Sequence, residues 1–164
     1  MLSVRTILHP TDFSASSEAA FGLACALARD YDARLLVLHV TMPPPAVGYA
    51  EGVYVPAPEP TYNELRHKLY DVTPADPEIV VEHRLVEGDA ATEILRVAKE
   101  ANCDTIVMGT HGRTGFGRLL MGSVAEDVLR QAPCPVVTVR HPLPAPVASV
   151  NAEAEWEPAA LVPG

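Results

Sequence analysis

The chain has 164 residues, a length that suits one domain with enough chain to bury a core. Hydrophobic residues make up 48% of it, which argues against a disordered protein. Asp and Glu outnumber Lys and Arg by 21 to 12, so the net charge is −9. With no basic patch to overcome this charge, the chain is expected to bind neither nucleic acid nor anionic membranes.

No stretch has the length of a membrane span, and the first residues run into a strand-like segment without a charged leader. The three cysteines, Cys25, Cys103 and Cys134, show neither a disulfide framework nor a zinc spacing. We therefore expect a cytoplasmic protein with buried structural thiols and no metal site.

The first half of the chain alternates between strand and helix patterns. A short β-branched run predicts a strand at 4–8, and a helix capped by Ser14 follows it. The near-continuous apolar run at 34–40 predicts a strand that is covered on both faces. Residues 42–60, rich in proline, predict a loop, and 61–71 predict a short helix.

The second half continues the alternation. Strands are predicted at 79–86, 105–108 and 136–140, and helices at 90–102 and 123–131. Five strands alternating with helices predict a single-domain, five-stranded parallel sheet with helices on both faces, in the manner of flavodoxin or Rossmann folds.

The composition changes after His141. Residues 142–164 hold five prolines, many alanines and the single Trp, so we expect a mobile tail behind a nucleotide-binding domain at 1–141.

The segment from Gly109 to Ser123 carries the clearest chemical signal. It leaves the carboxyl end of the fourth strand, the edge where ligands bind in open α/β sheets, and it re-enters a helix at Ser123. Its glycines let backbone N–H groups approach an anion, and the helix adds its positive dipole end. On these grounds phosphate binding and a plain surface loop with a capped helix stay equally open. Neither a Walker lysine loop nor a dinucleotide glycine motif after the first strand is present.

The spacing Gly109-x2-Gly112-x9-Gly122-Ser123 resembles the ATP-binding signature of the universal stress protein family. The opening Ile7-Leu8-His9-Pro10-Thr11-Asp12-Phe13-Ser14 and the runs at 36–40 and 132–137 resemble other parts of that family. The resemblance covers about residues 1–141 and implies an adenine nucleotide alpha hydrolase-like fold. It implies the branch of the family that binds ATP, because every signature position is kept.

The resemblance also implies where each part of ATP would lie. Asp12 would accept hydrogen bonds from the adenosine, beside Pro10 and Thr11, and Val40 would meet the adenine edge. Met108 and Gly109 would line the ribose. The phosphates would meet Gly112, Gly122, Ser123 and Val124, with His111 as a further loop contact. Two alternatives stay open: Asp12 as a cap of the first helix, and His111 as a solvated loop residue.

The function expected from these features is a nucleotide-dependent regulatory module in the stress response, acting on an unidentified protein partner. The alternatives are a slow ATPase or phosphotransferase, and a dimeric scaffold without ligand. No catalytic residue is predicted, because no carboxylate other than Asp12 is available to orient water, and Mg²⁺ is left open as a companion of ATP. The apolar fifth strand, Val136–Val139, predicts a homodimer, because a sheet of this kind leaves its last strand at an edge.

Overall fold

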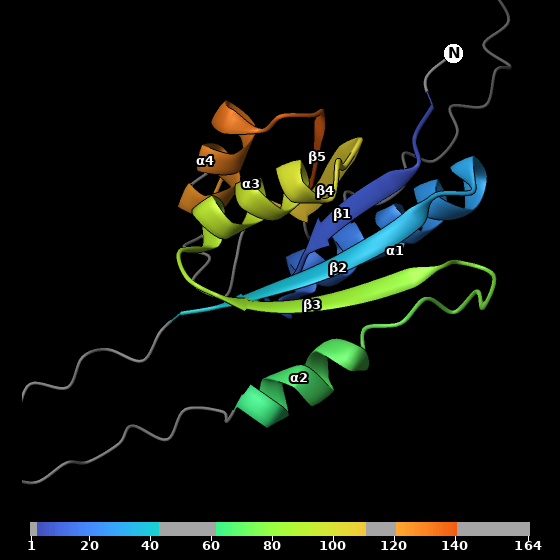
Figure 1. The fold of residues 1–164 in the computed structure, drawn as a ribbon, viewed down its shortest axis with the longest axis horizontal. Coiled ribbons are helices and arrows are strands. Elements are labelled where there is room, and N and C mark those ends of the chain that lie inside the picture. The colour runs from blue at the N-terminus through green and yellow to red at the C-terminus, as the bar shows by residue number, and fades with distance from the viewer. Residues whose placement is uncertain (1–2, 43–61, 111–120, 141–164) are drawn as a thin grey trace, which may run out of the picture.

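A five-stranded parallel sheet organises the chain, as the sequence predicts (Figure 1). The computed structural model describes residues 3–42, 62–110 and 121–140. The elements, in chain order, are β1 (Thr6–Pro10), α1 (Ala15–Tyr31), β2 (Arg34–Thr41), α2 (Tyr62–Tyr70), β3 (Val81–Glu87), α3 (Ala90–Glu100), β4 (Thr105–Gly109), α4 (Ser123–Gln131) and β5 (Val136–Val139). The proline-rich segment and the tail at 142–164 lie outside the described residues.

The boundaries differ from the predicted ones by a few residues, for local reasons. β1 runs through Pro10, which the sequence marks as a stop, because Pro10 pairs with Leu38 of β2 and the next N–H, that of Thr11, donates to the Leu38 carbonyl (2.8 Å). α3 ends at Glu100 rather than residue 102, because Asn102 adopts the left-handed conformation (φ 49°), which a helix cannot continue.

The sheet order is β3-β2-β1-β4-β5. From β1 the chain builds the sheet outward to β2 and β3, and it then returns to place β4 on the other side of β1. The connections after β1 and after β4 therefore run in opposite directions along the sheet. This order is not that of flavodoxin, in which β1 and β3 are neighbours. Both orders leave the fifth strand at an edge of the sheet, as the sequence predicts.

Alternate residues of the strands enter two separate cores. Leu8, Leu36 and Ile106 face α3 and α4, whereas Ile7, Leu35 and Val107 face α1 and α2. Figure 1 shows the two helical layers on opposite faces of the sheet. This arrangement explains the unbroken apolar runs of the central strands, which are buried on both faces.

Helix α1 packs closely on the central strands through alanines that are almost fully buried, Ala20, Ala24 and Ala28. Its first turn approaches β4 so tightly that a Cβ on Gly109 would lie 2.8 Å from the backbone carbon of Ser16. Glycine is therefore required at the carboxyl end of β4 to let this helix approach.

Candidate functional site

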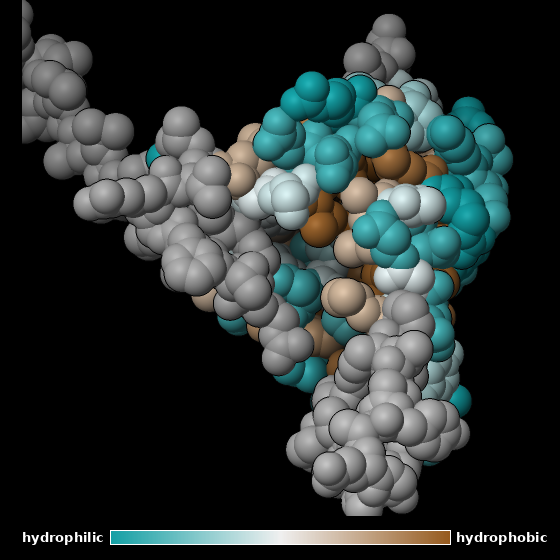
Figure 2. Space-filling model, turned by 90° about the vertical axis from the view of Figure 1, so that its left-hand side faces the viewer, coloured by the Kyte–Doolittle hydropathy of each residue, from teal (hydrophilic) through white to brown (hydrophobic). Residues whose placement is uncertain are grey.

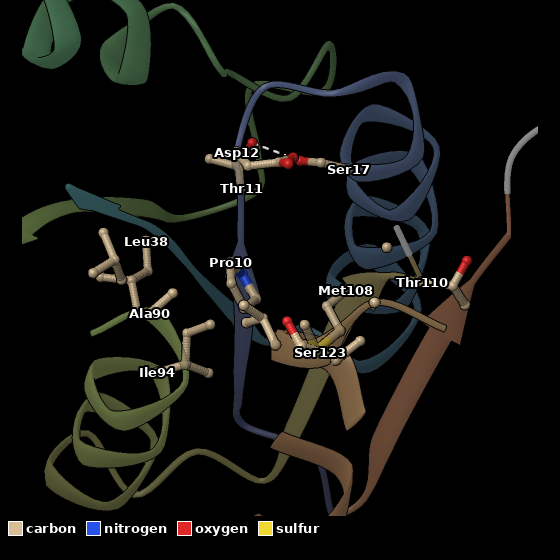
Figure 3. Close-up of a pocket in the computed structure, with 15 residues that line it drawn as sticks. Pro10, Thr11, Asp12, Ser17, Leu38, Ala90, Ile94, Met108, Thr110 and Ser123 are labelled. Atoms are coloured by element: carbon tan, nitrogen blue, oxygen red, sulfur yellow. Dashed lines mark hydrogen bonds between the residues drawn. The ribbon is translucent and has the colours of Figure 1, made fainter. Parts of the chain in front are cut away.

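A cavity of about 180 Å³ opens at the carboxyl edge of the sheet, between the ends of β1 and β4 (Figure 3). The β1–β4 ladder consists only of the pairs Ile7–Thr105 and Leu8–Ile106, so the two strands separate beyond these residues. The cavity occupies the topological switch point of the sheet, which is where ligands bind in folds of this kind. It is lined by Pro10, Thr11, Asp12, Ser17, Leu38, Val40, Ala90, Ile94, Met108, Gly109, Thr110, Gly122, Ser123, Val124 and Ala125.

Figure 2 looks onto this edge of the molecule, with apolar side chains at the centre of the described surface and hydrophilic side chains around them. In Figure 3, Leu38, Ala90 and Ile94 lie on one side of Pro10, and Met108 and Ser123 on the other. The cavity therefore has an apolar wall, built by β2 and α3, that faces a wall of polar backbone built by β4 and α4.

The amino end of α4 supplies that polar wall. Gly122 is its N-cap residue, and no side chain caps the helix. Ser123, Val124 and Ala125 form the first turn, whose N–H groups have no acceptor within a helix, and all three residues line the cavity. The approach to the helix is fixed by a 2.6 Å hydrogen bond from the Gly122 N–H to the Thr110 carbonyl. A set of free donors and the positive helix end therefore meet the cavity together.

The helix that the sequence predicts to begin at Ser123 does so, and its N-cap residue is Gly122, which has no side chain to cap it. Ser123 is the first residue of α4. Its side chain is exposed and takes no part in capping.

The turn between β1 and α1 holds a carboxylate at the opposite rim. One oxygen of Asp12, Oδ1, accepts hydrogen bonds from the Ser14 N–H (3.1 Å) and hydroxyl (2.6 Å). The Ser14 hydroxyl oxygen accepts in turn from the Ser17 N–H (3.2 Å), which makes Ser14 the cap of α1, as predicted. Asp12 is therefore not the cap itself. Its second oxygen has no hydrogen-bond partner among the described residues.

The base of this turn is held by further polar contacts. The hydroxyls of Thr11 and Ser17 lie 2.6 Å apart (Figure 3), and the Thr11 oxygen also accepts from the Phe13 N–H (3.1 Å). Phe13 adopts a left-handed backbone (φ 63°), which is rare for a residue with a large side chain. Its ring packs at a tilt against the ring of His39, whose Nδ1 is hydrogen-bonded to the Thr11 carbonyl (2.7 Å). The position of Asp12 is thus set by contacts on both sides of β1.

A buried histidine bridges β1 and β4 where they separate. His9 is fully buried, and its Nδ1–H donates to the carbonyl of Val107 (2.9 Å), just beyond the last paired residues of the two strands. Its Nε2 has no hydrogen-bond partner in the described structure. Burial lowers the pKa of His9 to about 4, although the bond to Val107 and the charge of Asp12 act in the other direction. His9 is therefore a neutral side chain at pH 7.

Every predicted site residue that the structure describes lines the cavity, whereas His111 and Gly112 lie outside the described residues. The sequence did not single out Ser17, Leu38, Ala90, Ile94, Thr110 and Ala125, which also line it. Ala90 and Ile94 belong to a helix that is adjacent to the cavity only in the folded chain. Ser17 had a local signal, since it lies in the first turn after the β1 carboxyl end.

The described residues contain no group of three or more His, Cys, Asp or Glu side chains that could hold a metal ion. Within the same part of the chain, no helix is long and apolar enough to cross a membrane.

The fold and the cavity define a parallel α/β protein with a cavity at its switch point, lined on one side by the amino end of a helix. The model of the universal stress protein family matches residues 3–140. Universal stress protein MJ0531 of Methanocaldococcus jannaschii is 37% identical over 141 residues, which make up 84% of this chain and 83% of that protein. The chain belongs to the universal stress protein family.

Solved structures of the family share the fold. Universal stress protein UspA from Lactobacillus plantarum superposes with a TM-score of 0.64 at 26% identity, over 84% of this chain and 98% of that one. A universal stress protein in complex with cAMP gives a TM-score of 0.61 at 28% identity, over 84% of this chain and 97% of its own.

The low pKa of His9 leads to a prediction about stability. In the unfolded chain a histidine titrates near pH 6.5, so between about pH 6.5 and about pH 4 the unfolded state takes up a proton that the folded state does not. The free energy of unfolding should therefore decrease as the pH is lowered from about 6.5 to about 4, by about 3 kcal/mol from His9 alone. We expect His9→Gln, which does not titrate, to flatten this fall in urea unfolding measured at a series of pH values.

The difference in unfolding free energy between the wild type and His9→Gln reports on His9 alone, because both proteins contain the same carboxylates that titrate in this pH range. Parallel curves for the wild type and His9→Gln would show that His9 is accessible to protons in the folded protein.

Proposed function

We propose that the cavity binds an adenine nucleotide, ATP, and that the protein acts as a nucleotide-dependent regulatory module in the stress response. The observation that carries the proposal is the uncapped amino end of α4, whose first-turn residues line the cavity opposite an apolar wall. A phosphate group and a purine ring require two surfaces of these kinds. The complex of a related universal stress protein with cAMP supports the same class of ligand.

The phosphates belong at the α4 side. Ser123, Val124 and Ala125 present N–H groups that water or a ligand must satisfy, and a phosphate bound there would lie against the positive end of the helix. Gly109 and Gly122 carry no side chains, so an anion can approach the backbone at these two positions of the wall. In a chain with a net charge of −9, these backbone donors are the described feature that favours an anion in this cavity.

The adenosine belongs at the other side. Val40 and Ile94 provide an apolar surface for the base, and the free oxygen of Asp12 can accept from a ribose hydroxyl or the base amine. Asp12 is the single ionisable side chain among the described residues that line the cavity. Its negative charge favours this neutral part of the nucleotide and disfavours the phosphates.

The same lining favours binding over catalysis. Phosphoryl transfer depends on cations and carboxylates placed around the transferred group. Of the described lining residues, Asp12 carries the only carboxylate that could hold Mg²⁺ or orient water. A steady-state phosphate-release assay separates the proposed module from the alternative of a slow ATPase or phosphotransferase, and copurified nucleotide would separate it from a scaffold without ligand.

The phosphate wall can be tested at Gly122. Its backbone is extended (φ −76°, ψ 154°), a conformation that valine adopts, so Gly122→Val should fold normally. The new β-branched side chain would stand at the rim that the phosphates must approach. We expect calorimetry to show ATP affinity reduced by about tenfold or more, equivalent to about 1.4 kcal/mol.

Gly22→Val is the matched control. A Cβ at Gly22, on the exposed side of α1, would meet no atom within 4 Å. This variant should bind ATP as the wild type does. Equal affinity of all three proteins would refute the assignment of the α4 end to the phosphates.

Asp12 and Ser14 allow ligand binding to be separated from helix capping. Asp12→Ala removes the carboxylate from the cavity rim, and we expect about a tenfold loss of ATP affinity, as for one hydrogen bond to a charged group. Ser14→Ala removes the α1 cap and its bond to Asp12 but leaves the carboxylate in place. It should cost about 1 kcal/mol of unfolding free energy and little affinity. If the two variants lost affinity equally, the contribution of Asp12 would be structural.

We also propose a homodimer built on β5. This strand lies at one edge of the sheet with no described strand beyond it, and its residues Val136–Val139 are apolar except Thr138. Such an edge can pair with a second copy about a two-fold axis, which closes the assembly. A lysine at position 137 would place a charge in this contact. We expect light scattering across a dilution series to give a dimer for the wild type and a monomer for Val137→Lys, with circular dichroism confirming that the variant is folded. A monomer at every wild-type concentration would disprove the dimer.

A further inference from the structure

Two cysteines lie together at the end of the sheet opposite the cavity. Cys103 comes two residues before β4, and Cys134 comes two residues before β5. These strands are neighbours, paired in parallel from Ile106 and Val136 onward. The start of β4 is also joined to the residue that precedes β5, because the Ile106 N–H (3.0 Å) and the Thr105 hydroxyl (3.1 Å) both donate to the carbonyl of Pro135.

The segments that carry the two cysteines are held against each other. Pro135 follows Cys134 directly, and its carbonyl accepts the hydrogen bonds from Thr105 and Ile106, two and three residues after Cys103. A disulfide needs Cα atoms roughly 4.4–6.8 Å apart, which is on the scale of the spacing of about 4.8 Å between neighbouring strands.

Both side chains also face the same core. Cys103 is buried in the cluster beneath α3 and α4, and Cys134 is half-buried against that cluster. The two thiols interact electrostatically, since the charge of Cys134 helps to raise the pKa of Cys103. Cys25 is different, because it packs on the other face of the sheet, on α1.

We propose that Cys103 and Cys134 form a redox-active pair, which closes into a disulfide by exchange with a small-molecule disulfide such as oxidised glutathione. The more exposed thiol, that of Cys134, loses its proton and attacks one sulfur of glutathione disulfide, releasing one glutathione thiolate. The Cys103 thiol then loses its proton and attacks the Cys134 sulfur of the mixed disulfide, releasing the second glutathione. The two thiols are oxidised to one disulfide, and one glutathione disulfide is reduced to two glutathione molecules.

The surroundings of the two thiols make their oxidation slow. Burial raises the pKa of Cys134, and it raises the pKa of Cys103 to about 11, even though Arg34 and Arg84 act in the opposite direction. Because the thiolate is the attacking species, few molecules are reactive at neutral pH. The pair therefore stays reduced in brief exposure and closes under sustained oxidising conditions.

Closure would join two distant parts of the chain. The segment between Cys103 and Cys134 contains β4, the Gly109–Gly122 connection and α4. The crosslink would tie both ends of this segment together at the amino edge of the sheet, away from the cavity. A loop of this length loses entropy in the unfolded state, so the oxidised protein should resist unfolding better than the reduced one.

The test is to equilibrate the full chain in buffers of defined reduced-to-oxidised glutathione ratio, quench with acid, denature, alkylate and count the free thiols by mass spectrometry. Reduced protein should take up alkyl groups at all three cysteines, whereas oxidised protein should take up one, at Cys25. Peptide mapping should show a crosslink between Cys103 and Cys134. The oxidised form should melt about 5 °C or more above the reduced form.

Matched variants assign the bond. Cys25→Ser should still lose both remaining free thiols on oxidation, whereas Cys134→Ser and Cys103→Ser should form no intramolecular crosslink. Three free thiols at every glutathione ratio would overturn the proposal. So would a stable mixed disulfide at Cys134, a crosslink to Cys25, or a crosslink between two chains on a non-reducing gel.

Discussion

The separation of β1 from β4 beyond Leu8 and Ile106 is the constraint on which the candidate site depends. Parallel strands that stayed paired to their ends would leave no room at this edge, but the next residues of β1 are His9 and Pro10. Pro10 has no N–H to extend a ladder, and the ring of His9 bonds the Val107 carbonyl in place of a backbone donor. The strands are therefore held together through a side chain while their ends diverge. A buried imidazole with one unpartnered nitrogen is the cost of this opening.

The proposed anionic ligand would meet an acidic protein through the wall of the cavity that α4 forms. The donors of this wall are backbone N–H groups at the start of α4, whose position is fixed by the helix and by the Thr110–Gly122 hydrogen bond. Fixed dipoles act only at short range, so they select for an anion at that spot without changing the overall field of the molecule. Asp12, the single carboxylate among the described lining residues, stands at the opposite rim, where it is hydrogen-bonded to Ser14.

The two edges of the sheet carry different chemistry. The carboxyl edge, where β1 and β4 diverge, contains the cavity. The amino edge is closed by hydrogen bonds, including those from the Arg5 and Thr6 N–H groups to the Asp104 carboxylate, and it holds the thiols of Cys103 and Cys134. Because β4 runs from one edge to the other, the strand that forms one side of the cavity begins beside the cysteine pair.

Sequence by itself determined the elements of this protein, because helices and strands depend on short-range patterns. The apolar runs of β2 and β4, the Ser14 cap of α1 and the extent of α4 from Ser123 to Gln131 follow from residues close in the chain. The glycine spacing and its place after a strand also predicted which segment forms one wall of the cavity. Tertiary structure decided what depends on strand order and register. It brought Ala90 and Ile94 of α3 to the cavity and made Gly122 the cap of α4. It also joined His9 to Val107 and placed Cys103 beside the segment of Cys134. These contacts join residues far apart in the chain, so no local pattern encodes them, and only the packing of the folded sheet fixes their distances.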